Sequence, residues 1–485
     1  MVRLPSWGCI SMSVISKLTM LGAAGSGGAI EFVRIGEGTQ GTYNYNQYQN
    51  AVLRPDTGEL IVYRNRRSSV GSDHYLEKYT PELEYVSGAN AYFLNASGNI
   101  SRNQYGSPKW SSDPDYGYDV LGGDGSTYAG PAKYADFSAS TVKQQNVGYL
   151  YNTNNYIGRL TRAYNIGDRT YVVNSAQSYG GAVGSFKHTA TSGSTSATQP
   201  TNPGHENNYN TQFFIDVQPV DPTSQSTNHI AIHSSNYHTS FYTLNSSLQV
   251  TGNGWQIGSG SILQYWSNMC IDSSSNTAWA YDNNNKYLHG YNYSTNTLTS
   301  YEINYPGSGN PTGVSCYLAL INGYLYLQVP KRSIGMFVIK INPSNPTTGE
   351  QSKLFKDTSG YGAPSNNYIG NQDGFLIEGP NEFHGTTDLM YIGFSNYTNS
   401  SGNFMRTNMA VCTWDNLSQI ANYNSTLTVS NSVVSLTQQS LGGSSQNSFG
   451  GSLYSASSIN APNTNGPAFY LTGPDGLNVN TISEI

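Results

Sequence analysis

Alternating apolar strands separated by short polar turns recur along this chain and leave few folds open to it. The clearest copy lies between residues 269 and 301. It contains, in order, Cys270-Ile271, Ala278 to Tyr281, a turn at Asp282 to Asn285, and Tyr287 to Tyr291. Period-2 alternation bounded by Asn-rich turns is typical of β-strands that have one buried face.

The next copy repeats this order with a sharper turn signal. Its strands are expected at Cys316 to Leu320, Tyr324 to Leu327 and Met336 to Ile341. Asn322-Gly323 separates the first two, and both residue types accept the positive φ of a two-residue hairpin turn. We therefore expect antiparallel meanders in both copies rather than βαβ crossovers.

Weaker copies extend the pattern over most of the chain. They lie at Ala51 to Tyr79, Tyr92 to Ile100, Tyr149 to Val173, Phe213 to Val250 and Phe375 to Trp414. Successive copies begin roughly 45 to 60 residues apart, and a four-stranded propeller blade spans about 40 to 50. The pattern predicts an all-β fold, a β-propeller of about six or seven antiparallel blades at residues 41–425. A β-sandwich and a parallel β-helix are the alternative architectures.

Charge is scarce in this sequence, and the polar residues are mainly Asn, Ser, Thr and Gln. Charged residues make up 11% of the chain, against about 25% in an average soluble protein. The net charge is −6 and the pI is about 5.7. Affinity for nucleic acid depends on clustered Lys and Arg. The only basic run is Arg64, Arg66 and Arg67, so we expect no nucleic-acid partner.

The N-terminal segment, residues 1–40, is expected to be a docking arm for another subunit. It is rich in Gly and Ala, and Lys17 interrupts its apolar stretch, which is too short for a membrane span. An exposed apolar arm gains stability by burial against a partner. The residues expected to make that contact are Leu21, Gly22, Ala23, Ala24 and Gly25. Folding of the arm onto its own propeller is the alternative.

The C-terminal segment, residues 426–485, is rich in Ser, Thr, Asn and Gly. No Lys or Arg follows Arg406. Leu427 to Val429 and Val433 to Leu436 alternate like strands. We expect an extended tail that completes the ring or contacts a neighbour, rather than a second globular domain.

One Gly-rich loop carries the residues of a candidate cation site. Its carboxylates are Asp113, Asp115, Asp119 and Asp124. Calcium prefers such oxygen-rich loops, although the order differs from the D-x-[DN]-x-[DN]-G loop and no closing Glu follows. A structural calcium ion is therefore the only cofactor considered, and an acidic surface turn is the alternative.

Three histidines, His229, His233 and His238, form the densest imidazole cluster. Even spacing places the first two on one strand face, but no acidic neighbour completes a metal site. Ordinary strand histidines are the alternative. The four cysteines are far apart and have no metal-ligand spacing, so we interpret them as buried free thiols.

Catalytic signatures are missing from the sequence. It contains no G-x-S-x-G, H-E-x-x-H or P-loop. Glu378 and Glu382 are a carboxylate pair of the kind that glycosidases use, but their spacing does not define a distance. We therefore expect a protein that is not an enzyme. Four tryptophans are interpreted as inter-blade packing residues, with stacking on sugar rings as the alternative: Trp255, Trp266, Trp279 and Trp414.

In composition and organisation the chain resembles virion proteins of tailed bacteriophages, particularly marine ones. The resemblance rests on the arm Leu21 to Gly28 and on the charge-poor body rich in Tyr, Asn and Gly. It carries no diagnostic motif and transfers no site residue. It implies a non-catalytic structural part of an extracellular particle, in the tail or as a fibre or decoration. Other virion subunits are the implied partners, together with a host surface glycan.

A secreted or cell-surface propeller that binds or hydrolyses polysaccharide is the alternative function. The arm distinguishes the two hypotheses. If residues 1–30 dock into a particle, their deletion leaves a folded body that is no longer incorporated into purified particles. Normal incorporation of the truncated chain would refute the arm hypothesis.

Overall fold

The computed structural model consists mainly of β-strands over the residues that it describes. These residues are 34–38, 45–54, 57–68, 71–94, 100–102, 107–110, 118–123, 129–134, 149–150, 160–167, 169–175, 182–187, 197–199, 213–234, 239–257, 267–283, 285–304, 316–331, 335–356, 374–397, 405–419, 427–446, 454–455, 459–460, 469–472 and 479–484. Within them the helical elements are α2 (Asn381–His384) and the 3-10 helix η1 (Leu417–Gln419). No helix in these segments is long and apolar enough to cross a membrane.

Antiparallel strands that follow one another in the sequence form sheets, which we number as blades. Blade 1 contains β2 (Tyr45–Leu53), β3 (Leu60–Ser68), β4 (Gly71–Tyr79) and β5 (Tyr85–Leu94), and β6 (Ile100–Arg102) pairs with β5. Blade 2 contains β7 (Ser107–Trp110), β8 (Tyr118–Gly123) and β9 (Ala129–Tyr134), with β10 (Tyr149–Leu150) beside β9. Blade 3 contains β11 (Leu160–Ile166), β12 (Arg169–Ser175), β13 (Ala182–Lys187) and β14 (Ala197–Gln199).

Blades 4 to 6 repeat this four-stranded meander. Blade 4 contains β15 (Phe213–Pro219), β16 (His229–Ser234), β17 (Thr239–Leu244) and β18 (Val250–Ile257). Blade 5 contains β19 (Cys270–Asp272), β20 (Thr277–Asp282), β21 (Tyr287–Asn292) and β22 (Thr297–Ile303). Blade 6 contains β23 (Tyr317–Ile321), β24 (Tyr324–Lys331), β25 (Gly335–Ile341) and β26 (Thr348–Lys356).

Blades 5 and 6 are the two clearest repeats of the sequence, and their predicted strands are confirmed. The hairpin between β23 and β24 turns at Asn322 and Gly323, whose φ angles are 47° and 75°. Two consecutive positive φ values define a type I′ turn, which matches the twist of the flanking strands. Ile321 and Tyr324 pair directly across this turn.

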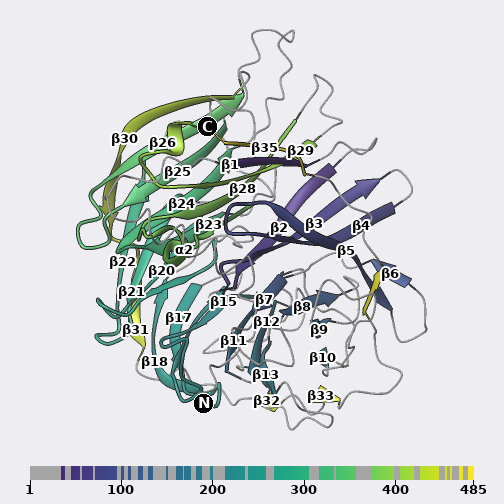
Figure 1. The fold of residues 1–485 in the computed structure, drawn as a ribbon. Coiled ribbons are helices and arrows are strands. Elements are labelled where there is room, and N and C mark those ends of the chain that lie inside the picture. The colour runs from purple at the N-terminus through teal and green to yellow at the C-terminus, as the bar shows by residue number, and fades with distance from the viewer. Residues whose placement is uncertain are drawn as a thin grey trace, which may run out of the picture.

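The innermost strands of the blades contact one another in a closed cycle. The cycle among the described residues runs β2, β7, β11, β15, β19, β23, β27 (Phe375–Glu378) and back to β2. The protein is therefore a seven-bladed β-propeller, as the predicted all-β fold of six or seven blades required. Figure 1 shows the blades following one another around the ring, from purple in blade 1 to green in blades 6 and 7.

Apolar side chains fill the spaces between neighbouring blades. Between blades 6 and 7, the shared cluster includes Tyr326, Val338, Met390, Ile392 and Cys412, all 1% exposed or less. Comparable clusters join blades 5 and 6, 7 and 1, 3 and 4, and 4 and 5. The face of each strand that points to an adjacent blade therefore carries the core, and this explains the period-2 pattern of the sequence.

The N-terminal strand closes the ring. Blade 7 contains β27, β28 (Met390–Tyr397) and β29 (Met405–Cys412), and β1 (Arg34–Gly38) is its fourth strand. Arg34 lies opposite Val411 in this antiparallel pair. The propeller therefore begins at Arg34 rather than at the predicted residue 41. Residues 1–33, which include the rest of the predicted arm, lie outside the described part of the chain.

The C-terminal segment adds a fifth strand to the blades, and we call residues 427–484 the C-terminal belt. Its strands are β30 (Leu427–Gln439), β31 (Gly443–Gln446), β32 (Tyr454–Ser455), β33 (Ile459–Asn460), β34 (Phe469–Thr472) and β35 (Val479–Glu484). In this order they pair with blades 6 and 5, then 4, 3, 2, 1 and 7. Each pairing is antiparallel to the outer strand of its blade.

The C-terminal belt therefore makes one circuit of the ring in the direction opposite to the blades. It leaves blade 7 after β29 and returns to it at β35, which pairs with β1. In Figure 1 the yellow strands β31, β32 and β33 lie at the rim of the ring. The two ends of the described chain are thus neighbours in one sheet.

Candidate functional site

Short polar turns occupy one face of the propeller in blades 4 to 6. Asp272 is the last residue of β19, and its carboxylate accepts hydrogen bonds from the hydroxyls of Ser274 and Ser275, both at 2.6 Å. Although burial opposes this, these bonds lower the pKa of Asp272 below its ordinary value. Asp221, in the corresponding turn of blade 4, accepts similar bonds from Thr223. The carboxylates of both turns therefore stabilise the turns themselves.

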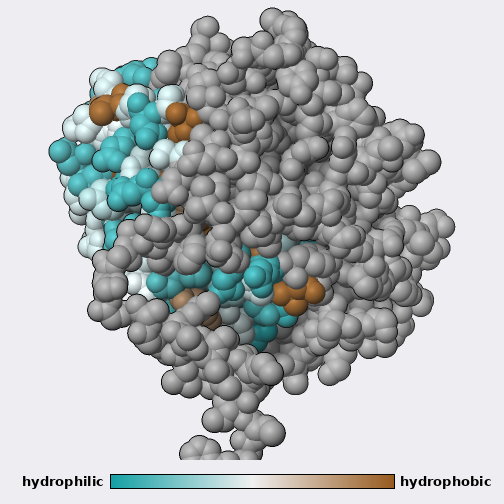
Figure 2. Space-filling view, turned by 45° about the horizontal axis from the view of Figure 1, so that its top comes forward, coloured by the Kyte–Doolittle hydropathy of each residue, from teal (hydrophilic) through white to brown (hydrophobic). Residues whose placement is uncertain are grey.

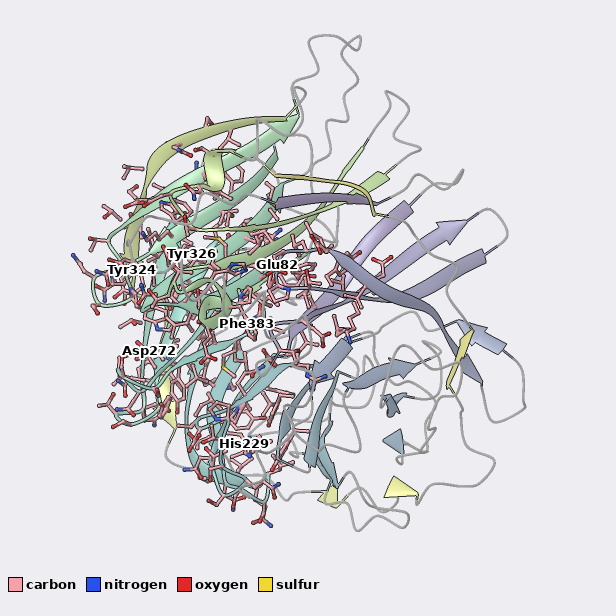
Figure 3. All side chains as sticks on the ribbon, in the orientation of Figure 1. Glu82, His229, Asp272, Tyr324, Tyr326 and Phe383 are labelled. Carbon is pink, nitrogen blue, oxygen red and sulfur yellow. The ribbon has the colours of Figure 1, made fainter. Side chains whose placement is uncertain are left out.

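A cluster of aromatic and charged side chains lies beside this face on blade 6, and we call it the rim cluster. It consists of Tyr324, Lys340, Glu350 and Trp414. The first three come from β24, β25 and β26, whereas Trp414 follows β29 of blade 7. Figure 3 labels Tyr324 and Tyr326, which are two residues apart on β24. The rim cluster thus joins two blades.

The geometry of the rim cluster is set by one ammonium group and one carboxylate. The Lys340 Nζ lies 4.6 Å from the ring centre of Tyr324 and 5.9 Å from that of Trp414. The Trp414 Nε1 donates a hydrogen bond to Glu350 Oε2 at 2.6 Å. Tyr324 is 38% exposed, whereas Tyr326, which packs against Trp414, is buried.

The rim cluster combines aromatic rings with charged groups at the surface. Flat aromatic faces bind apolar surfaces such as the faces of sugar rings, and charged groups beside them bond to hydroxyls. Sequence reasoning named Trp414 but missed Tyr324, Lys340 and Glu350. Their spacing of 16 and 10 residues along a meander carries no motif. Strand register places Lys340 opposite Glu350 and Tyr326, and Tyr324 lies two residues before Tyr326 on the same strand face.

Trp414 packs against the apolar cluster between blades 6 and 7, and two of the other predicted tryptophans are packing residues as well. Trp279 is 4% exposed and packs against Gly290 in blade 5. Trp255 is half-buried next to Gly443 of the C-terminal belt. Both serve packing, as the first interpretation held, while Trp266 lies outside the described residues. Figure 2 shows that the described surface on this side is mostly hydrophilic, with small separate hydrophobic patches.

His229 and His233 are buried strand residues. The Nδ1 atom of His229 lies 2.8 Å from the hydroxyl of Tyr164 in blade 3. Burial lowers the pKa of His229 to about 4, so its ring is neutral at pH 7. His238 lies outside the described part. Within that part no three His, Cys, Asp or Glu side chains are grouped to hold a metal ion.

The two glutamates considered for hydrolysis lie at the turn between β27 and β28. Glu378 Oε1 accepts a hydrogen bond of 2.7 Å from the amide of Asn381, whose carbonyl oxygen accepts one from the Leu389 backbone. Burial raises the pKa of Glu378, and the bond from Asn381 opposes that change. Glu382 belongs to α2. The bonds of Glu378 therefore organise a loop.

Most of the remaining predicted site residues lie outside the described residues. These are Asp113, Asp115 and Asp124 of the candidate cation loop and Leu21 to Gly25 of the arm. Asp119 belongs to β8, opposite Lys109 and Lys133 in the strand register. The cation and arm hypotheses remain predictions. Cys316 and Cys412 are buried free thiols, as expected, and Cys270 is a partly buried one.

Comparison with known proteins gives likenesses of shape only. No family model and no curated protein matches the chain. The structure of U3-55K is 8% identical with a TM-score of 0.45, and covers 79% of this chain and 99% of its own. The WD40 repeats of RRP9 are 8% identical, with a TM-score of 0.42 over 79% and 98%. A luciferin-regenerating enzyme is 11% identical, with a TM-score of 0.39 over 79% and 97%.

Those values are too low to carry an argument about activity or partners. The propeller architecture follows from the strand pairings of the chain itself.

Proposed function

We propose that this protein is a non-catalytic structural component of a phage particle, in its tail or as a fibre or decoration. Its role is to hold surface groups in fixed positions and to contact a host surface glycan. The observation that carries this proposal is the C-terminal belt, which pairs with the outer strand of every blade in the described structure. The charge-poor composition of the body also supports it.

The C-terminal belt suits a protein that is displayed in many copies. Unpaired outer strands are templates for uncontrolled association between sheets. A fifth strand covers them, and in blades 1 to 4 it consists of 2 to 4 residues. Such short edge strands are poor templates, so blades 1 to 4 are protected from pairing with the sheets of neighbouring copies.

The rim cluster supplies the contact with the glycan. Tyr324 offers an exposed ring, and Glu350 and Lys340 offer an acceptor and donors for sugar hydroxyls. A single site of this kind binds weakly. Many copies on one particle raise the overall affinity by 10²- to 10⁴-fold, on the order expected for multivalent binding.

Particle membership is tested by mass spectrometry and immunogold labelling of purified virions from an infected culture that encodes this chain. We expect the full chain in stoichiometric, repeated copies. Its absence from purified virions, together with its presence as free protein in the medium, would refute the proposal.

A secreted or cell-surface propeller that binds or hydrolyses polysaccharide is the second candidate function. The rim cluster favours it, because such a site also serves an isolated protein. Release of reducing sugars from polysaccharide by the purified chain would establish hydrolysis. Retention on polysaccharide without release, and without particle membership, would indicate a secreted lectin.

A further inference from the structure

The first strand of the C-terminal belt differs from all its other strands in length. β30 has 13 residues, whereas the other belt strands have between 2 and 6. It pairs with β26 from Leu427 to Ser435 and with β22 from Leu436 to Gln439. The two partners lie on opposite edges of β30. One edge of β30 is therefore without a strand partner, among the described residues, along most of its length.

Hydrogen bonds at the crossover show which residues direct their backbone groups to that open edge. The Leu436 N–H donates to Thr347 of blade 6, and the Ser435 carbonyl accepts from the Asn304 N–H of blade 5. Backbone groups alternate between the two edges of a strand. Val429, Asn431 and Val433 therefore present their N–H and C=O groups to the open edge, whereas Ser430 and Ser432 bond to β26.

The described sequence of β30 itself carries none of the residues or bulges that usually prevent pairing with another sheet. The sequence Leu427 to Gln439 contains no charged residue and no Pro, and these are the usual protective residues of edge strands. Pairing with β26 shows no register shift over its nine residue pairs. Val433 is 75% exposed, more than the other two exposed large hydrophobic residues described, Val86 and Tyr324.

We propose that this edge is a dimerisation surface, and that its occupant is β30 of a second copy. A two-fold axis through Asn431 places the two strands antiparallel. Asn431 then lies opposite Asn431 of the second copy, and Val433 lies opposite Val429. The three residues whose backbone groups face the edge thus meet the same three residues in hydrogen-bonded register.

Side-chain chemistry favours this self-pairing. Two valine pairs flank the axis, and β-branched residues stabilise cross-strand contacts. The asparagine amides at the axis each contain a donor and an acceptor, so they bond to each other across the two-fold. A symmetric contact brings identical side chains close together. Because β30 carries no charged side chain, its two copies do not repel each other. This dimer is a property of the free chain and does not depend on membership of a particle.

Sedimentation equilibrium of the full-length protein over a range of concentrations tests the proposal. We expect a monomer–dimer equilibrium. Val433→Lys places two like charges beside the axis and is expected to raise the dimer dissociation constant at least about tenfold, an effect of about 1.4 kcal/mol. Gln438→Lys is the matched control, since Gln438 is exposed on the same strand beyond the open edge. It should leave the dissociation constant unchanged.

A disulfide tests the register separately. Antiparallel hydrogen-bonded pairs have Cα atoms about 5.5 Å apart, within the range of a disulfide. Asn431→Cys should therefore form a covalent dimer under mild oxidation, whereas Gln438→Cys and the wild-type chain should not. A chain that stays monomeric at all concentrations, or a dimer unaffected by Val433→Lys, would overturn the proposal. Equal cross-linking by both cysteine variants would overturn its register.

Discussion

Burial lowers the pKa of His229, which sequence analysis considered as a metal ligand. His229 begins β16, where its Nδ1 atom meets the Tyr164 hydroxyl, and both rings lie near Tyr171. Strand spacing indicated correctly that His229 and His233 belong to one strand. It gave no sign that a tyrosine 65 residues earlier would be the partner, because contacts between blades depend on how the ring closes.

The depressed pKa of His229 predicts a loss of stability in acid. An unfolded histidine has a pKa of about 6.5, and the folded value is about 4. Below pH 6.5 the unfolded chain therefore binds more protons than the folded one, so the contribution is complete above pH 6.5 and declines toward pH 4. We expect His229 by itself to account for a loss of about 2 kcal/mol of unfolding free energy between pH 7 and pH 5.

Urea unfolding at pH 7 and pH 5 measures this loss, and His229→Gln should reduce it. His289 is a second contributor of the same sign, since burial lowers its pKa to about 3. A pH dependence that is unchanged in the His229→Gln protein would show that His229 is not responsible.

Close packing predicts a second effect at a single residue, in blade 5. A Cβ atom on Gly290 would lie 2.7 Å from the Trp279 ring, which is buried between blades. Gly290→Ala should therefore lower the unfolding free energy by about 1–3 kcal/mol through overpacking. Gly442→Ala is the control, because nothing lies within 4 Å of a Cβ atom there. Equal thermal midpoints for the two variants would contradict this packing.

Elements that form through local contacts were predictable, and elements that form through distant contacts were not. Asn322-Gly323 specifies its hairpin within a few residues, so the strands of blade 6 could be predicted from sequence. β31 to β34 have between 2 and 4 residues and no apolar alternation. Their partners are hundreds of residues away, as in the pairing of Phe469 with Phe93, and sequence periodicity holds no such information.

The rim cluster could not be predicted from the sequence for the same reason. Tyr324 and Tyr326 share a strand face by spacing alone, but Lys340 and Glu350 join them through register, and Trp414 comes from another blade. Tyr324→Ala should weaken retention on a glycan ligand about tenfold, if stacking contributes an ordinary aromatic contact of about 1.5 kcal/mol. Val86→Ala, at an exposed site on blade 1, is the matched control. Glycan arrays probed with both variants make the comparison.

Proline substitutions distinguish the two edges of β30. Ser432→Pro removes a backbone donor that faces β26 and should lower the unfolding free energy by about 1–3 kcal/mol through the lost ladder hydrogen bond. Asn431→Pro removes a donor on the open edge, where proline is tolerated, and should cost much less. Thermal unfolding followed by circular dichroism compares them. A larger loss for Asn431→Pro would mean that the orientation of β30 is reversed.

At the scale of the whole molecule, the ring is closed twice. The first closure is the pairing of β1 with β29, and the second is the C-terminal belt, which ends on β1. The alternation at Leu427 to Leu436 predicted strands in this segment, and the structure assigns them to the chain's own blades. The predicted arm and cation loop lie mostly outside the described residues, so they stay predictions.

Electron cryomicroscopy of the full-length protein, at a resolution that separates strands about 4.7 Å apart, tests the circuit of the C-terminal belt most directly. We expect seven blades whose outer strands each carry density from residues 427–484, ending antiparallel to β1. Outer strands without added density, or a C-terminal segment that extends away from the ring, would contradict it.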